Sequence, residues 1–230
     1  MGSQLTRMTI WGGQALWYAC LNGASDVVRL LLQRTGDNLA LKEKDSTGKT
    51  LLHAMAIGLK EWDDAGVARV ATLLLDEDIK VDIKDNKGRT AVWYGCPKGN
   101  LHVIKLLLER GKGALTVEEK DNMGRSLLHA RVMAMGLQQD MRVVSFLLNR
   151  DIEVDVKDNK GRTILWYAGK KRLDKVERFL LEVGADKDLA FTTTDVDEDL
   201  SEESEESEVG EVGEESYTTE ESDETEETEW

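Results

Sequence analysis

The chain has 230 residues, 40% of them hydrophobic and 33% charged, and a formal net charge of −15. Its length suits one or two compact units. It has no apolar run of about 18 residues and no secretory signal, which argues against a membrane-spanning segment and against export. Because the chain has only two cysteines, we expect a protein of a reducing compartment, the cytoplasm or the nucleus.

The negative charge is concentrated at the C-terminal end. Residues 192–230 contain 19 acidic side chains and no Lys or Arg, whereas the rest of the chain contains 26 acidic and 30 basic side chains. The protein is thus a mildly basic body, with a net charge of about +4, followed by an acidic tail. We expect residues 189–230 to be disordered, because their few large apolar side chains cannot offset the loss of chain entropy.

The first predicted element along the chain is a leader, residues 1–11, to which the sequence assigns no structure. Its first six residues fit the loose pattern for N-myristoylation at Gly2, a pattern short enough to occur by chance. From residue 12 to residue 188, one pattern of turn and apolar segments recurs.

The recurring pattern is organised around a seven-residue turn that begins with Lys and Asp, has Gly at its fifth position and ends in Thr or Ser. The turn occurs four times, starting at Lys44, Lys84, Lys120 and Lys157. Asp caps such a turn, Gly adopts its left-handed conformation, and Thr or Ser begins a helix. The four glycines are 40, 36 and 37 residues apart, a spacing that indicates a stacked repeat array.

Two helices are predicted after each turn. A short apolar segment comes first, and a longer segment with apolar residues at i, i+3 and i+4 follows, which indicates one buried face. Short extended arms, Val81–Lys84 and Val154–Lys157, lead into two of the turns, so that the turns project as fingers. The five predicted units span about 12–43, 44–83, 84–119, 120–156 and 157–188.

These units resemble the ankyrin repeat family. The finger and first helix match its Asp-x-x-Gly-x-Thr-x-Leu-His-x-Ala pattern, and Gly23–Leu31 and Gly99–Leu107 match the start of its second helix. The resemblance implies an all-α ankyrin repeat solenoid of about five helix-turn-helix units with projecting β-turn fingers, which the disordered acidic C-terminal tail follows. Trp in place of the family's His resembles divergent ankyrin arrays of filamentous fungi.

The units alternate in the residue at the family's His position. His53 and His129 keep the histidine, while Trp17, Trp93 and Trp166 replace it, as if a pair of repeats had been duplicated. We expect the tryptophans to pack in the interior rather than to stack on nucleic-acid bases.

No pattern for catalysis is present. The chain has no phosphate-binding Gly-rich loop, no nucleophile elbow and no His-Glu-x-x-His motif. Cys20 and Cys96 are two repeats apart, as are His53 and His129, and helices that pack about 8–10 Å apart separate each pair by roughly 16–20 Å. That distance is too long for a disulfide or a shared metal ion. We therefore expect a non-catalytic protein with no cofactor, no metal and no small-molecule substrate.

In ankyrin arrays, partners usually contact the finger tips and the exposed end of the first helix. Mapped onto this chain, that rule implies a contact set of Thr47, Lys49, Lys87, Arg89, Pro97, Lys98, Met123, Arg125, Lys160, Arg162, Lys170 and Lys171. Stacking would align the finger lysines and arginines as a basic ridge. In the alternative interpretation, these charges only keep the finger tips in water.

The leading hypothesis is a protein-interaction scaffold that binds a partner protein, not identified by the sequence, on the concave finger and first-helix surface. The acidic tail would modulate that binding through an intramolecular contact with the basic ridge. As an alternative, the tail binds basic proteins such as histones, in a nucleic-acid-associated regulator. Direct binding of nucleic acid by the body is not favoured, because its net charge is small and it has no recognised motif.

Overall fold

A computed structural model describes residues 13–34, 39–58, 64–77, 79–111, 113–136, 139–150 and 152–191. The predicted leader, the acylation pattern at Gly2 and the acidic residues from 192 onward lie outside this described part of the chain.

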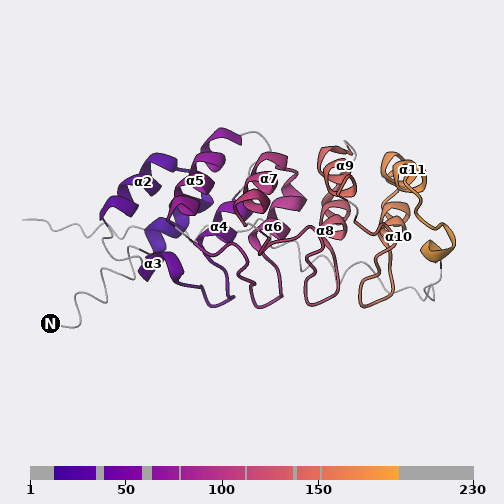
Figure 1. The fold of residues 1–230 in the computed structure, drawn as a ribbon, viewed down its shortest axis with the longest axis horizontal. Coiled ribbons are helices and arrows are strands. Elements are labelled where there is room, and N and C mark those ends of the chain that lie inside the picture. The colour runs from indigo at the N-terminus through magenta and orange to yellow at the C-terminus, as the bar shows by residue number, and fades with distance from the viewer. Residues whose placement is uncertain are drawn as a thin grey trace, which may run out of the picture. The chain divides into compact units, whose positions relative to one another are not determined.

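Five helix pairs follow one another through the described residues. Helical residues 13–21 pair with α2 (Ser25–Arg34), and the later pairs are α4 (Leu51–Ile57) with α5 (Asp64–Asp76), α6 (Ala91–Lys98) with α7 (Leu101–Arg110), α8 (Leu127–Ala134) with α9 (Arg142–Leu148), and α10 (Ile164–Lys170) with α11 (Asp174–Glu182). In Figure 1 the second helices of the pairs form one row, the first helices form a second row, and the turns project beyond it. The predicted all-α repeat fold is confirmed.

The first helices begin where the turn chemistry predicts. Thr90 caps α6 by accepting a hydrogen bond from the Trp93 backbone N–H, and Thr163 does the same for Trp166 in α10. Such a cap satisfies one of the four N–H groups that a helix start leaves without a partner. Because the caps come directly after the finger glycines, each finger also sets the residue at which its helix begins.

The core lies between successive helix pairs. First helices pack on first helices, α4 on α6, α6 on α8 and α8 on α10. Among the second helices, α2 packs on α5, α5 on α7 and α7 on α9. In α7, the buried residues Val103, Ile104, Leu107 and Leu108 form the single apolar stripe that the i, i+3, i+4 pattern predicts. No helix of the part of the chain that the structure describes is long and apolar enough to cross a bilayer.

Two short elements were not predicted. A one-turn helix, α3 (Leu39–Lys42), precedes the first finger. The predicted arm Val81–Lys84 has no helix or turn, but the predicted arm Val154–Lys157 begins with a turn at residues 154–155 and is not extended throughout. A 3-10 helix, η1 (Asp188–Phe191), follows the last unit and contacts α10. We assigned residues 189–191 to the disordered tail, and this prediction was wrong, because they are helical. The helical turn packs on the first helix of the last unit, and Leu189 is half-buried.

Candidate partner-binding surface

Each of the four fingers, residues 45–50, 85–90, 121–126 and 158–163, is held by the aspartate at its first position. In the 85–90 finger, Oδ1 of Asp85 accepts hydrogen bonds from the backbone N–H groups of Lys87 (2.9 Å) and Arg89 (2.8 Å). The Gly88 N–H donates to the Asp85 carbonyl, and Gly88 has φ +76°. The other three fingers repeat these bonds, so the predicted turn chemistry of Asp and Gly is confirmed.

The finger tips are bonded to one another. The backbone N–H of Asn122 donates to the carbonyl of Lys87 (3.0 Å), and its side-chain amide donates to the carbonyl of Asn86 (3.1 Å). Asn86 makes the corresponding two bonds to the 45–50 finger, and Asn159 makes them to the 121–126 finger. These three asparagines form a ladder that holds each tip against the preceding one.

The ladder also restricts the finger glycines. A Cβ added to Gly88 would lie 2.2 Å from Oδ1 of Asn122, and a Cβ at Gly124 would lie 2.4 Å from Oδ1 of Asn159. Glycine is therefore required at these positions for two reasons, the left-handed backbone conformation and the close approach of the next finger.

The second oxygen of the finger aspartate carries a buried ion pair in three of the four fingers. Oδ2 of Asp85 accepts from Nε of Arg89 (3.0 Å) and from its terminal nitrogen (3.0 Å), with the two side chains only 1% and 7% exposed. Asp121 and Arg125 form the same pair, as do Asp158 and Arg162. A buried guanidinium needs such a partner, because an unpaired buried charge is strongly destabilising.

Tyrosines complete two of these networks. The hydroxyl of Tyr94 donates to Oδ2 of Asp85 (2.7 Å), and that of Tyr167 donates to Oδ2 of Asp158 (2.8 Å). Burial by itself raises the pKa of Asp85, but the Arg89 backbone N–H, the Tyr94 hydroxyl and the Arg89 guanidinium outweigh it and hold the pKa below its usual value. Burial likewise raises the pKa of Asp158, but the Arg162 backbone N–H, the Tyr167 hydroxyl and the Arg162 guanidinium outweigh it and hold that pKa below its usual value. Burial and the bond to Asp85 raise the pKa of Tyr94, which remains a donor.

The buried ion pairs correct the predicted basic ridge. Arg89, Arg125 and Arg162 are 6%, 2% and 8% exposed, so their guanidinium groups face the interior and not a partner. The Asp of the same turn holds each arginine inward. The Trp93 ring covers Arg89, whose guanidinium lies 5.1 Å from the ring centroid, and the Trp166 ring covers Arg162. Of the predicted contact set, these three arginines belong to the framework.

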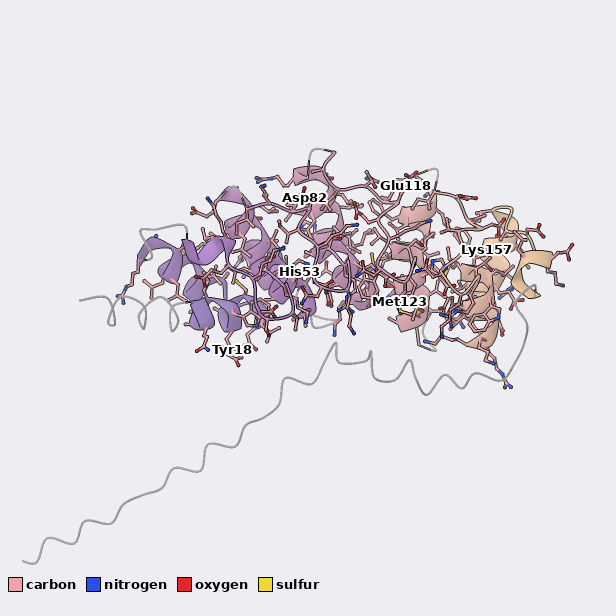
Figure 2. All side chains as sticks on the ribbon, turned by 90° about the horizontal axis from the view of Figure 1, so that it is seen from below. Tyr18, His53, Asp82, Glu118, Met123 and Lys157 are labelled. Atoms are coloured by element: carbon pink, nitrogen blue, oxygen red, sulfur yellow. The ribbon has the colours of Figure 1, made fainter. Side chains whose placement is uncertain are left out.

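The rest of the predicted set lies at or near the surface, seen from the finger side in Figure 2. The exposed members are Thr47, Lys87, Met123, Lys160, Lys170 and Lys171, and the half-buried members are Lys49, Pro97 and Lys98. Met123, 37% exposed, is an apolar side chain at a finger tip between two lysine tips. The finger tips and the C-terminal ends of the first helices thus bring these side chains onto one side of the stack.

Beneath the fingers, the histidines link neighbouring units. Nδ1 of His53 accepts the Thr50 backbone N–H (3.1 Å), and Nε2 bonds the carbonyl of Arg89 in the next finger (3.0 Å). His129 bonds Ser126 and the Arg162 carbonyl in the same way. Burial lowers the pKa of both histidines, against the opposing effect of these carbonyls, which favours the neutral ring that can accept at Nδ1.

Trp93 takes the histidine position between the third and fourth units. It is buried, as predicted, and its Nε1–H has no hydrogen-bond partner among the described residues. The Arg125 guanidinium of the next finger lies 5.7 Å from its ring centroid, so a cation–π contact stands where His53 has a hydrogen bond. Trp17 and Trp166 are half-buried, less than the predicted interior packing implies.

The cysteines and histidines are separate. Cys20 and Cys96 are both buried and unpaired, and burial raises the pKa of each thiol to about 12. Within the described ranges, no three His, Cys, Asp or Glu side chains lie together as ligands of a metal ion. We therefore assign the polar side chains of the fingers and first helices either to holding the fold or to contacts at the surface.

Residues 16–117 match the family described as ankyrin repeats, in three copies. The chain is an ankyrin repeat protein. The match covers the first three helix pairs of this ankyrin repeat protein, and the pairs α8/α9 and α10/α11 continue the array with the same finger geometry.

Curated relatives carry the same repeat. An ankyrin repeat protein of fowlpox virus is 33% identical over 115 residues, which are 50% of this ankyrin repeat protein and 18% of the viral one. Neurogenic locus notch homolog protein 1 of Mus musculus is 29% identical over 148 residues, 64% of this chain and 5% of that protein. The ankyrin repeat, SAM and basic leucine zipper domain-containing protein 1 of Equus caballus is 27% identical over 139 residues, 60% of this chain and 26% of that protein.

The chain therefore spans about a quarter or less of the length of these relatives. They come from a virus and from animals, and the fungal origin that the tryptophans suggested stays a prediction. The ankyrin family is generally non-catalytic, and its repeats generally serve as protein-interaction modules.

Two features of the site were missed from the sequence. Tyr94 and Tyr167 had a signal, because each lies directly after a Trp and nine residues after a finger Asp. Tyr18 also follows a Trp, but the residue nine positions before it is Thr9, and Tyr18 is 53% exposed. The Asn ladder had one too, since Asn recurs at the same position of three fingers, while the first finger has Ser46 there.

Proposed function

We propose that the chain is a non-catalytic scaffold that binds a partner protein on the surface formed by the finger tips and the C-terminal ends of the first helices. The observation that supports it most strongly is the contrast within the last three fingers. Their aspartate, arginine and asparagine side chains hold the turns, whereas Lys87, Met123 and Lys160 are exposed at the tips of bonded backbones. A preorganised row of this kind loses little entropy on binding.

The partner's contact region is expected to be acidic with apolar contacts. The exposed side chains include Lys87, Lys160, Lys170 and Lys171, with Met123 among them. Rim lysines change association rate and salt dependence more than affinity, and Met adapts its shape to a partner. Binding should therefore weaken as salt rises, without being abolished.

Affinity capture from cells of the source organism, followed by mass spectrometry, tests the proposal with two charge-matched variants of the full chain. One variant carries Lys87→Glu, Lys160→Glu and Lys170→Glu on the finger side. The control carries Arg69→Glu, Lys105→Glu and Lys175→Glu, exposed residues of the second helices. We expect the wild-type chain and the control to retain the same protein and the finger variant to lose it; equal loss from both variants would contradict the assigned surface.

The acidic tail is proposed to modulate this binding, on grounds of charge alone. Residues 192–230 contain 19 acidic residues and no basic one, so they compete with an acidic partner for the finger lysines. A full chain whose tail Asp and Glu are changed to Asn and Gln should bind the captured partner more tightly at low salt, and equally at high salt. Unchanged affinity at low salt would show that the tail does not modulate partner binding.

A second candidate role rests on the same tail. A run so rich in carboxylates binds basic proteins, histones included, whatever the array does. Capture of basic proteins that persists in the finger variant but is lost from the neutralised tail would favour this role. For either role the proposed location is the cytoplasm or nucleus, which two unpaired, buried cysteines support.

A further inference from the structure

A pocket of about 480 Å³ lies beside the first finger, whose last residue, Thr50, helps to line it. Its apolar lining comes from two segments, Leu41 at the end of α3 and the pair Ile79 and Ile83 in the arm that leads to the second finger. Leu41 is 4% exposed, and the two isoleucines are half-buried. The volume lies in the range of pockets that hold a ligand group, and these side chains provide an apolar floor for it.

Three lysines border this floor. Lys42 and Lys44 come from the first segment and Lys80 from the second, and all three are exposed. Glu77 is the one acidic side chain among the residues that line the pocket. None of the three lysines has an ion-pair partner within the described residues, so their charge faces solvent.

The position of Lys42 has the opposite charge in the later units. The residue three positions before the finger Asp is Lys42 in the first finger, but it is acidic in the other three, as Asp82, Glu118 and Asp155. Figure 2 shows Asp82 and Glu118 along one edge of the stack.

The position of Lys80 also changes, whereas that of Lys44 is lysine in every finger. The residue five positions before the finger Asp is Lys80 in the second finger, but Thr116 and Glu153 in the third and fourth. The floor position of Ile83 is Glu119 in the next unit, where Glu119 pairs with Lys84 at 3.2 Å. The repeat geometry therefore does not require Lys42, Lys80 or Ile83, which distinguish this pocket from its neighbours.

We propose that this pocket is a second docking site, for an acidic peptide segment of another protein that places one large apolar side chain on the floor and its flanking carboxylates on the lysines. The site goes beyond the finger surface, with which it shares none of the proposed contact residues. Lysines on two chain segments, on both sides of an apolar floor, match an extended chain with several carboxylates better than a single anionic group.

Each half of the proposed peptide has its own role. The apolar side chain removes floor surface from water and supplies affinity, while the carboxylates supply specificity and a salt-dependent association rate. An acidic segment without an apolar residue would bind weakly everywhere on the lysine-bearing face. An apolar segment without acids would have no preference for this pocket over other exposed apolar side chains.

The test uses the full chain and a fluorescein-labelled peptide of six Glu around a central Trp, at low salt, with fluorescence anisotropy as the readout. A second peptide has Ser in place of Trp. The chain variant carries Lys42→Asp and Lys80→Thr, the residues that the next unit has at these positions, so the repeat fold accommodates them. The control carries Lys105→Asp and Lys175→Thr, exposed lysines of α7 and α11, so that it has the same change of charge.

We expect the double variant to weaken binding of the Trp peptide roughly tenfold, the Ser peptide to bind roughly tenfold more weakly than the Trp peptide, and the control to leave affinity within about twofold. Ile83→Glu, again the residue of the next unit, should abolish the advantage of Trp over Ser while leaving the circular dichroism spectrum unchanged. No binding of the Trp peptide by the wild-type chain would overturn the proposal. So would equal losses in the double variant and the control, which would show that only general charge is at work.

Discussion

The first and second fingers have the same turn but different surroundings, and the difference separates local from repeat-to-repeat interactions. Asp45 and Asp85 both use Oδ1 to accept the two backbone N–H groups of their turn. Only Asp85 is buried, and only its Oδ2 binds an arginine and a tyrosine. The Oδ1 bonds therefore suffice to form a finger, whereas the Oδ2 bonds attach a finger to the core.

The substitution Asp85→Ala tests this difference most strongly. It leaves the buried Arg89 guanidinium without its partner, a loss that costs about 3–5 kcal/mol in folding stability. Asp45→Ala removes only turn bonds at an exposed site and should cost about 1 kcal/mol. Urea unfolding of the two variants measures both values, and equal costs would show that the ion pair adds nothing to the turn.

A glycine substitution sharpens the comparison between a finger in the stack and a free loop. Gly88→Ala puts a Cβ in the left-handed region and against Asn122, and should cost about 2–4 kcal/mol. Gly113→Ala has a similar φ of +87° but no atom within 4 Å of the added Cβ, so it should cost about 1–2 kcal/mol.

The double variant Gly88→Ala with Asn122→Ala identifies the cause of the larger cost. If the ladder is responsible, removing the Asn122 side chain should recover part of the stability lost in Gly88→Ala. Costs that simply add in a double-mutant cycle would mean that backbone strain alone is responsible.

The histidine-linked and tryptophan-linked units should differ in their response to acid. Burial lowers the pKa of His53 and His129, so their neutral rings stabilise the fold above the ordinary value of 6.5, and this stabilisation is lost as pH falls below it. The lowered pKa of Asp85 acts only below its ordinary value of 3.8. Between pH 7.5 and pH 5 the loss of stability should therefore come from the histidines.

The variant His53→Gln with His129→Gln checks this assignment, because Gln can still accept the capping N–H but does not titrate. Its unfolding free energy should change less than that of the wild type between pH 7.5 and pH 5. His102→Gln, at an exposed position, should leave the wild-type pH dependence intact. A pH dependence that persists in the double variant would exclude the two histidines as its source.

The smallest effect on stability is expected at the finger tips. Met123→Ser and Lys170→Gln change exposed side chains and should alter the free energy of unfolding by less than about 0.5 kcal/mol. If the tips form the binding surface, the same variants weaken partner binding, as measured by titration calorimetry with the captured protein. Loss of stability without loss of affinity would place these residues in the framework.

The sequence predicts the fold well because its signals are local. Turn Asp and Gly, the cap at Thr90 and the apolar stripe of α7 act within a few residues, and the structure has them where the pattern predicts. The site was predicted less completely. Arg89 looks like any finger cation in the sequence, and only the Trp93 and Tyr94 rings of the following helix show that it is buried.

Features that join different repeats were the hardest to predict. The asparagine ladder and the lysine pocket depend on residues 36 to 40 positions apart, such as Asn86 with Ser46. The helix of residues 188–191 was missed because a single turn is too short to show a sequence period, while its packing on α10 depends on the end of the array.

If the bonded fingers present their outward side chains to a partner, amide hydrogen exchange of the full chain should change when the captured protein is added. We expect slower exchange at residues 46–47, 86–87, 122–123 and 159–160 and at the C-terminal ends of α6 and α10, with no change in α5, α7 and α9. Slower exchange confined to the second helices, with the finger tips unchanged, would contradict it.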